Sequence, residues 1–312
     1  MRRAALTLLA LLAAAPARGD FMTGWEAYER GDMATAIAEW TRAAKAGDAK
    51  SAYNLAQSHA RGVGVPRDES KALAWYERAA EGGLASAQYN AGIYHLEGRG
   101  TRPDPDKATV HFEKAAAQGH AGAAFALARR WSESDPPRDD LTVAWLRRAV
   151  EGGHGEAGCM LGQYVLAGRG IRQDFAEGLR LLEDGATAGE TYCQGALGYL
   201  HQEGAAGVPR DLAKAARWFR AAADRGNPKA MAALGDVLLR SASGVDGLRE
   251  AAEWLRKAAE AGDAAGAYLF AVMRERGEGV GRDVADARRW YRRAADAGDR
   301  RAVEALDRLA GK

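Results

Sequence analysis

The sequence predicts an all-α fold, a solenoid of about eight stacked helical hairpins followed by one capping helix. Its 312 residues contain a glycine that recurs every 34 to 37 positions. A second small residue keeps the same period, and the apolar residues between them follow one helical face. The glycines are Gly47, Gly83, Gly119, Gly153, Gly189, Gly226, Gly262 and Gly298, and the small residues are Ala56, Gly92, Ala128, Gly162, Gly198, Gly235 and Ala271. One continuous array is expected in place of separate globular domains.

Residues 1–19 are predicted to form a Sec-type signal peptide. Arg2 and Arg3 precede an apolar run that is too short to cross a membrane as a helix. Two possible cleavage sites follow, ending at Ala17 and at Gly19, and no cysteine lies near them for lipid attachment. We therefore expect a periplasmic or secreted bacterial protein. Removing this segment brings the net charge of +2 close to zero, which argues against nucleic acid as a partner.

Both ends of the array are expected to be capped. Residues 20–48 predict an N-terminal hairpin with a tight turn, since only five positions separate Gly31 from Ala36, and this spacing resembles an ordinary tetratricopeptide unit. Residues 299–312 predict a single amphipathic helix that covers the last apolar face. Its apolar residues are Ala302, Val303, Leu306 and Leu309.

Residues 49–298 are expected to hold seven copies of a two-helix repeat, as residues 51–83 illustrate. A first helix ends near Gly62, a loop runs to Asp68, and a second helix ends at Gly83. Asp68 is placed to accept the unpaired N–H groups that begin the second helix, and Gly83 can adopt the left-handed conformation that ends it. The apolar face of that helix consists of Ala72, Trp75, Tyr76, Ala79 and Ala80.

The alanine pair and the tryptophan of this second helix recur, so both are predicted to pack in the interior. An alanine lets the neighbouring helix approach, where leucine would be too large. The tryptophan position is occupied by Trp75, Trp145, Trp218, Trp254 and Trp290, with His111 and Leu181 in the other copies.

Cys159 and Cys193 are the two cysteines of the chain. A disulfide needs Cα atoms within about 7 Å, whereas packed helices lie about 8–10 Å apart. We expect two small core residues, with a bond as the alternative in an oxidising compartment.

The loops and first helices point to a known family. Residues 87–92 read Ala-Gln-Tyr-Asn-Ala-Gly and precede Gly-Arg-Gly at 98–100, and residues 62–68 read Gly-Val-Gly-Val-Pro-Arg-Asp. These strings resemble the Sel-one-like repeat, a relative of the tetratricopeptide repeat. The resemblance implies a right-handed α/α superhelix. Two copies depart from the pattern, at loops 134–139 and 241–244.

The resemblance also places candidate partner-binding residues on a concave face. In the related tetratricopeptide fold the inner positions lie three before and one after the small residue. The candidates are Tyr53, Gln57, Tyr89, Ile93, Phe125, Arg129, Tyr199 and Tyr268, and the same two rows continue through Cys159, Gln163, Gly195, Ala232, Asp236 and Val272. Aromatic side chains are common anchors for a partner, but tyrosine at the first position is also usual in the family as a packing residue.

No metal, cofactor or catalytic residue is predicted. His59, His95 and His201 share one register, three residues after the small residue, which the related fold uses for packing. The Gly-x-Gly loops lack the third glycine of a dinucleotide site, and the chain has no His-Glu-x-x-His, Gly-x-Ser-x-Gly or Ser-x-x-Lys motif. We therefore do not expect an enzyme.

The sequence favours a non-catalytic exported scaffold. We expect a monomer without a membrane span that binds a protein or peptide on its concave face. Bacterial proteins that resemble this repeat include periplasmic regulators, so regulation of an envelope signalling protein is one role that the resemblance implies. A cell-wall-related hydrolase, penicillin-binding or β-lactamase-like, is the alternative, because cysteine-rich relatives have been linked to that activity. A purely structural envelope protein is a third hypothesis.

Overall fold

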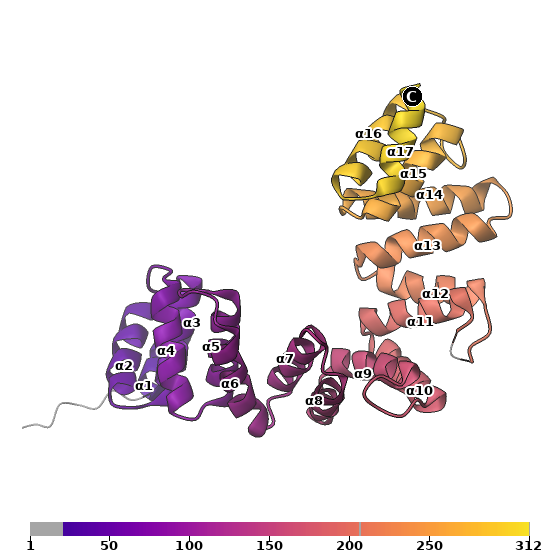
Figure 1. Cartoon of the computed structure of the whole chain (residues 1–312). Coiled ribbons are helices and arrows are strands. Elements are labelled where there is room, and N and C mark those ends of the chain that lie inside the picture. Colours follow the sequence, from indigo (N-terminus) through magenta and orange to yellow (C-terminus); the bar gives the residue numbers. More distant parts are fainter. Residues whose placement is uncertain (1–20, 206, 312) are drawn as a thin grey trace, which may run out of the picture. The chain divides into compact units, whose positions relative to one another are not determined.

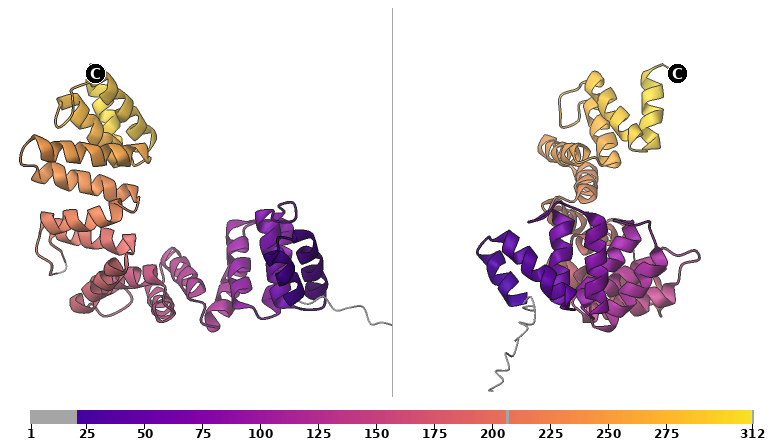
Figure 2. Two further views of the ribbon diagram at one scale, coloured as in Figure 1. Left: turned by 180° about the vertical axis from the view of Figure 1, so that it is seen from behind. Right: turned by 90° about the vertical axis from the view of Figure 1, so that its left-hand side faces the viewer.

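The computed structural model describes residues 21–205 and 207–311, and every regular element within those ranges is an α-helix. The helices form two compact units, the first ending at Arg129 and the second beginning at Arg130. Within each unit, successive helices pair and stack on the next pair (Figures 1 and 2). The predicted all-α repeat fold is confirmed. The predicted signal peptide lies outside the described residues.

The N-terminal unit holds the first six helices and most of the seventh. They are α1 (Phe21–Glu29), α2 (Met33–Lys45), α3 (Ala49–Arg61), α4 (Glu69–Glu81), α5 (Ala85–Glu97), α6 (Pro105–Ala117) and α7 (Ala121–Ser132).

The C-terminal unit holds the end of α7 and ten further helices. They are α8 (Asp139–Glu151), α9 (Gly155–Ala167), α10 (Phe175–Ala188), α11 (Thr191–Glu203), α12 (Leu212–Ala223), α13 (Pro228–Ser241), α14 (Val245–Glu260), α15 (Ala264–Arg276), α16 (Val284–Asp296) and α17 (Arg300–Leu309). None of the described helices is both long and apolar enough to span a bilayer.

The residues predicted to begin and end the helices of each repeat do so in the structure. All eight recurring glycines have positive φ, between 82° and 102°, the left-handed conformation that ends a helix without steric cost for glycine. The Asp68 carboxylate accepts a hydrogen bond from the Lys71 N–H at 3.0 Å and caps α4. Equivalent aspartates cap α6, α10, α12 and α16.

The second glycine of the Gly-x-Gly loops touches the preceding hairpin. A Cβ on Gly100 would overlap the backbone of Glu69, where α4 begins, and Gly100 also has φ of +69°. Arg99, beside it, pairs with Glu69 and lies over the Tyr94 ring at 4.1 Å. The loop therefore joins successive hairpins as well as the two helices of one hairpin.

The core differs from the prediction in one respect. The recurring tryptophans are only half-buried, whereas the next residue of each second helix is buried. Those buried residues are Tyr76, Phe112, Leu146, Leu182, Phe219, Leu255 and Tyr291. Consecutive residues lie about 100° apart around the helix axis, so the tryptophans and the buried residues that follow them face different neighbours. Several tryptophans lie under a cation from their own helix, as with Lys257 over Trp254 at 4.2 Å.

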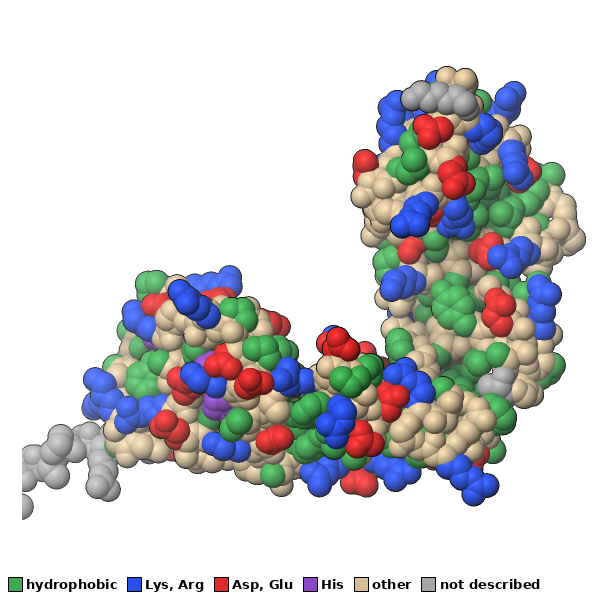
Figure 3. Space-filling view, in the orientation of Figure 1, with side chains coloured by type: hydrophobic (Ala, Val, Ile, Leu, Met, Phe, Trp, Pro, Cys, Tyr) green, Lys and Arg blue, Asp and Glu red, His purple; other side chains and the backbone are tan. Residues whose placement is uncertain are grey.

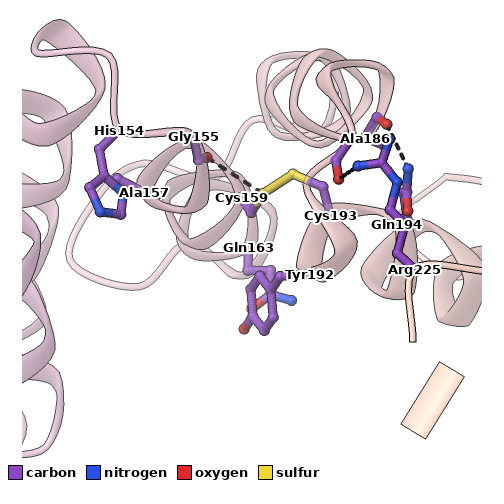
Figure 4. Close-up of a disulfide and its surroundings, with 11 residues drawn as sticks. His154, Gly155, Ala157, Cys159, Gln163, Ala186, Tyr192, Cys193, Gln194 and Arg225 are labelled. Carbon is purple, nitrogen blue, oxygen red and sulfur yellow. Dashed lines mark hydrogen bonds between the residues drawn. A yellow bond between two sulfur atoms is a disulfide. The ribbon is translucent and has the colours of Figure 1, made fainter. Parts of the chain in front are cut away.

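The expectation of two unbonded cysteines is wrong. Cys159 on α9 and Cys193 on α11 form a disulfide, with an S–S distance of 2.07 Å and a Cα–Cα distance of 5.1 Å (Figure 4). Gly185 on α10 faces the two sulfurs, and a Cβ there would overlap Cys193 Sγ. Facing Cα atoms of two packed helices can lie closer than the helix axes, because each Cα lies about 2.3 Å from its own axis, so an axis spacing of about 8–10 Å does not exclude a bond.

Both ends of the array have the helices expected there. A tight turn at residues 30–32 joins α1 to α2, and Trp40 on α2 is 2% exposed. The last helix, α17, buries Ala302 and Ala305, but Val303, expected on its apolar face, is 47% exposed.

Candidate partner-binding surface

The candidate residues of the N-terminal unit are largely engaged in their own fold. Tyr53 is half-buried, its ring packs edge-on against Tyr76 at 5.7 Å, and its hydroxyl accepts a hydrogen bond from Asn90 Nδ2 at 3.2 Å. Tyr89 stacks on His120 with ring centroids 4.6 Å apart. These tyrosines therefore pack between repeats, which is the alternative that the family resemblance left open.

The remaining N-terminal candidates differ in exposure. Phe125 is only 9% exposed, so the expectation of an exposed aromatic anchor there is wrong. Ile93 is half-buried and Arg129 is exposed. Gln57 lines a hollow of about 260 Å³ together with Trp25 and other residues of α1 to α3.

An apolar hollow of about 400 Å³ lies in the C-terminal unit, and it contains the predicted residue Tyr199. Side chains of α9, α10 and α11 line it, and most of them are aliphatic. They are Gln163, Leu166, Ala167, Leu182, Ala196, Tyr199, Leu200 and Glu203, with Ala205 after α11. An apolar concavity with a few polar groups at its edge is typical of a binding site.

Two tyrosines are exposed on the same face of α11. Tyr192 and Tyr199 are seven residues apart, or two helical turns, and are 45% and 50% exposed. Between them, the surface at Gly195 is open, since a Cβ there would meet nothing within 4 Å. The Tyr192 hydroxyl donates to Gln163 Oε1 at 2.8 Å, and Figure 4 shows these two side chains together beside the disulfide. Sequence reasoning named Tyr199 but missed Tyr192, which lies outside the two expected rows.

Burial and two carboxylates act on the Tyr199 phenol. Burial, and then the charges of Asp263 and Asp236, raise the pKa of the Tyr199 phenol. The hydroxyl therefore stays protonated at neutral pH and can donate a hydrogen bond. Its ring packs edge-on against Phe219 at 4.9 Å, which holds the side chain in place.

The last candidate, Tyr268, lies apart from this hollow. It lines a polar hollow of about 370 Å³ between α15, α16 and α17, with Arg301 over its ring at 4.3 Å. Charged side chains, among them Glu275 and Arg308, make up much of that lining. Within the C-terminal unit, Tyr199 and Tyr268 thus line two different hollows.

The described residues include one group able to hold a metal ion. Glu77, His95 and His111 each offer a ligand atom, and these atoms lie within 4.8 Å of one another. Burial, and then the neighbouring His95, lower the pKa of His111, so its ring is neutral at neutral pH. Sequence reasoning placed His95 in the histidine register and His111 in the tryptophan register without connecting them.

A family model for the Sel1 repeat matches more than half of the chain, in six segments. They are residues 49–84, 85–120, 156–190, 191–227, 228–263 and 264–299. The chain belongs to the Sel1 repeat family. Residues 121–155, expected to form a further copy, are not among the matched segments.

Solved Sel1 repeat proteins share this fold. A Sel1 repeat protein from Oxalobacter formigenes is 30% identical with a TM-score of 0.76, over 93% of this chain and 86% of that one. The c5321 protein, a protective antigen of uropathogenic Escherichia coli strains, is 25% identical with a TM-score of 0.52, over 93% and 71% of the two chains. Yeast Tom70 shows likeness of fold alone, at 15% identity and a TM-score of 0.53, over 98% of this chain and 66% of that one.

Among curated proteins, none matches the sequence. Sel1 repeat scaffolds are generally protein-interaction modules, and the repeat itself is an interaction fold and not a catalytic one.

Proposed function

We propose that this Sel1 repeat protein is an exported scaffold that binds a protein or peptide on the surface formed by α9 and α11. One observation carries the proposal. The exposed face of α11 presents Tyr192 and Tyr199 beside an apolar hollow of about 400 Å³. Exposed tyrosines next to an apolar pocket are the usual composition of an interaction hot spot.

The chemistry of this surface defines the kind of partner. The hollow can accept an aliphatic or aromatic side chain, while Gln163 and Glu203 in its lining offer hydrogen-bond partners. Asp263 near Tyr199 favours a positively charged residue next to the apolar one, whereas Asp236 is already paired with Arg240. We infer a partner segment with one apolar anchor flanked by lysine or arginine.

Export is supported by two features of the chain. The N-terminal basic and apolar segment has the layout of a signal peptide. The disulfide between Cys159 and Cys193 is of a kind that persists in oxidising compartments and is rare in the cytosol. An envelope signalling protein is the partner class that we propose.

The hydrolase alternative has less support. Both cysteines are joined in one disulfide, so neither is available as a thiol nucleophile. We expect no turnover of a chromogenic β-lactam by the purified protein above a buffer blank. Turnover that survives repurification would favour the hydrolase.

Site-specific photocrosslinking tests the proposed surface. A benzoylphenylalanine placed at Tyr192, in protein expressed with its N-terminal segment in a bacterial host, should capture a partner in the periplasmic or membrane fraction. The matched control places the crosslinker at Phe175, which is 44% exposed on the neighbouring helix α10. Capture that is equal at the two positions would contradict the proposed surface.

The captured partner is then purified for a binding measurement. Tyr199→Ala should weaken its affinity about tenfold or more, and Phe175→Ala should leave it unchanged. Circular dichroism of both variants checks that the fold is intact, since Tyr199 also packs on Phe219. A folded Tyr199→Ala protein with unchanged affinity would show that the partner binds elsewhere.

A further inference from the structure

Three consecutive helices of the N-terminal unit bring two histidines and one glutamate together. Glu77 comes from α4, His95 from α5 and His111 from α6. One carboxylate oxygen and one ring nitrogen of each histidine lie within 4.8 Å of one another. The helices belong to two successive hairpins, so the group lies where one repeat packs on the next. Figure 3 shows histidine side chains at the surface of this unit beside acidic side chains.

The two histidines have unused ring nitrogens in a buried setting. His95 is 2% exposed, and its Nε2 lies 2.9 Å from Glu77 Oε1. The Nδ1 atoms of His95 and His111 are both buried and have no hydrogen-bond partner among the described residues. The two rings stack with an angle of 11° and centroids 5.5 Å apart. A buried polar atom without a partner is unfavourable, so these nitrogens can still accept a ligand.

Comparison with other repeats separates this group from ordinary packing. His59 and His201 occupy the same register as His95, and their Nδ1 atoms are also buried without a partner among the described residues. The second helix of the same hairpin carries Trp75 after His59 and Trp218 after His201, but His111 after His95. The register of Glu77 is held by Glu183 in the His201 copy. A single change, tryptophan to histidine at position 111, thus turns a packing position into a potential ligand.

We propose that Glu77, His95 and His111 bind a divalent transition-metal ion, with Zn²⁺ as the best match. Imidazole nitrogen and carboxylate oxygen are the ligands that zinc takes in sites with three protein ligands and one open position. The ion would connect two successive hairpins and stabilise their interface. This role is separate from partner binding on α11.

The geometry needs a small closure to accept the ion. Zinc–ligand bonds of about 2.0–2.2 Å place the ligand atoms of a tetrahedral site about 3.4 Å apart. The Glu77 side chain is 41% exposed and can rotate toward the histidines, while His95 is fixed in the interior. Lys107 and Lys114 lie near enough to His111 to act on its charge, and they also oppose a cation.

Cobalt and zinc titrations of the full chain, purified without a histidine tag and treated with a chelator, test the site. Co²⁺ should give the visible absorption of a tetrahedral nitrogen and oxygen site at one equivalent, and added Zn²⁺ should remove it. Calorimetry should give one Zn²⁺ per chain, and saturating Zn²⁺ should raise the Tm by several degrees.

Variants of the proposed ligands, and of His201 in another repeat, complete the test. His111→Trp installs the residue that five other copies have, so the protein should fold but lose the cobalt signal and the Zn²⁺-dependent rise in Tm. Glu77→Gln, at the surface, should weaken binding at least tenfold. His201→Gln, in the copy without a second histidine, should bind one equivalent as before. Equal binding by His111→Trp, or no saturable binding by the unmodified chain, would overturn the proposal. If His111→Trp does not fold, the Glu77→Gln titration decides.

Discussion

Two pairs of successive repeats, residues 49–120 and 156–227, use the same register in different ways. In the first pair the first concave position holds Tyr53 and Tyr89, which fill the space between helices and hydrogen-bond or stack across repeats. In the second pair the same position holds Cys159 and Gly195. A disulfide joins the repeats there, and the tyrosines of α11 are exposed.

The difference shows that one backbone plan can place the contacts between repeats on different residues. Where tyrosines bridge the repeats, they are not available to a partner. Where a covalent bond bridges them, the surface can stay open, as it does at Gly195 and beside Tyr199. In a solenoid, whose stability depends on contacts between neighbouring repeats, such an exchange is possible one interface at a time.

The largest effect is expected from breaking the disulfide. Cys193→Ala should lower the free energy of unfolding by about 3–4 kcal/mol, because a bond across 34 residues restricts the unfolded chain. Urea unfolding, followed by tryptophan fluorescence, measures the change. Reductant should lower the midpoint of the natural chain to a similar value and leave the variant unaffected. If the midpoint does not move, noncovalent contacts hold the second pair as they hold the first.

A change at Gly100 tests the first pair, where no covalent bond is present. Gly100→Ala should cost about 2–3 kcal/mol, since it adds a Cβ against the Glu69 backbone in a left-handed conformation. Gly83→Ala is the matched control. Gly83 also has positive φ, but a Cβ there would meet nothing within 4 Å, so only the backbone cost of about 1 kcal/mol remains. Equal effects in thermal unfolding would mean that the loop contact does not hold the repeats together.

The end of the array adds a third kind of contact, one that acid can break. Arg308 on α17 pairs with Glu275 at 2.7 and 2.8 Å, and the Tyr291 hydroxyl donates to the same carboxylate. Arg308, and then Tyr291, hold the pKa of Glu275 below its usual value of 4.5. A carboxyl with a lowered pKa stabilises the fold above about pH 5 and loses that contribution as the pH falls through its folded pKa.

Glu275→Gln should therefore lower the Tm by about 2 °C at pH 7, a small effect because solvent screens the exposed Arg308. The difference from the natural chain should shrink as the pH is lowered toward 3. Scanning calorimetry at several pH values measures it, and a difference that does not change with pH would assign the effect to the hydrogen bonds alone.

The repeat plan could be predicted from the sequence because it depends on local rules. Glycines such as Gly83 end helices by their own conformational preference. Asp68 caps the helix that follows it by accepting a hydrogen bond from the N–H three residues later. Such features repeat with the period and need no knowledge of distant contacts. The burial of each side chain was harder to predict. Trp75 and Tyr76 are adjacent in sequence, and only the packing of helices shows that Tyr76 is the buried one.

The disulfide and the histidine pair could not be predicted, for a related reason. Both depend on the approach of two helices, which belong to successive repeats for the disulfide and to one hairpin for the histidines. Gly185 allows Cys159 and Cys193 to come together, although average helix spacing argued against a bond. Likewise, a comparison within each register treats His95 and His111 separately, and only the packing of α5 on α6 brings their rings to 5.5 Å.

The smallest expected effect is the loss of stability when one tyrosine hydroxyl is removed in each pair of repeats. Tyr53→Phe removes an acceptor from the half-buried Asn90 and should cost about 0.5–1.5 kcal/mol. Tyr192→Phe removes a similar bond to Gln163, but water can replace it, because Tyr192 is 45% exposed. Its cost in urea unfolding should therefore be within error. A larger loss of stability for Tyr192→Phe than for Tyr53→Phe would contradict this expectation. It would mean that the Tyr192 hydroxyl contributes more to the stability of the fold than the Tyr53 hydroxyl does.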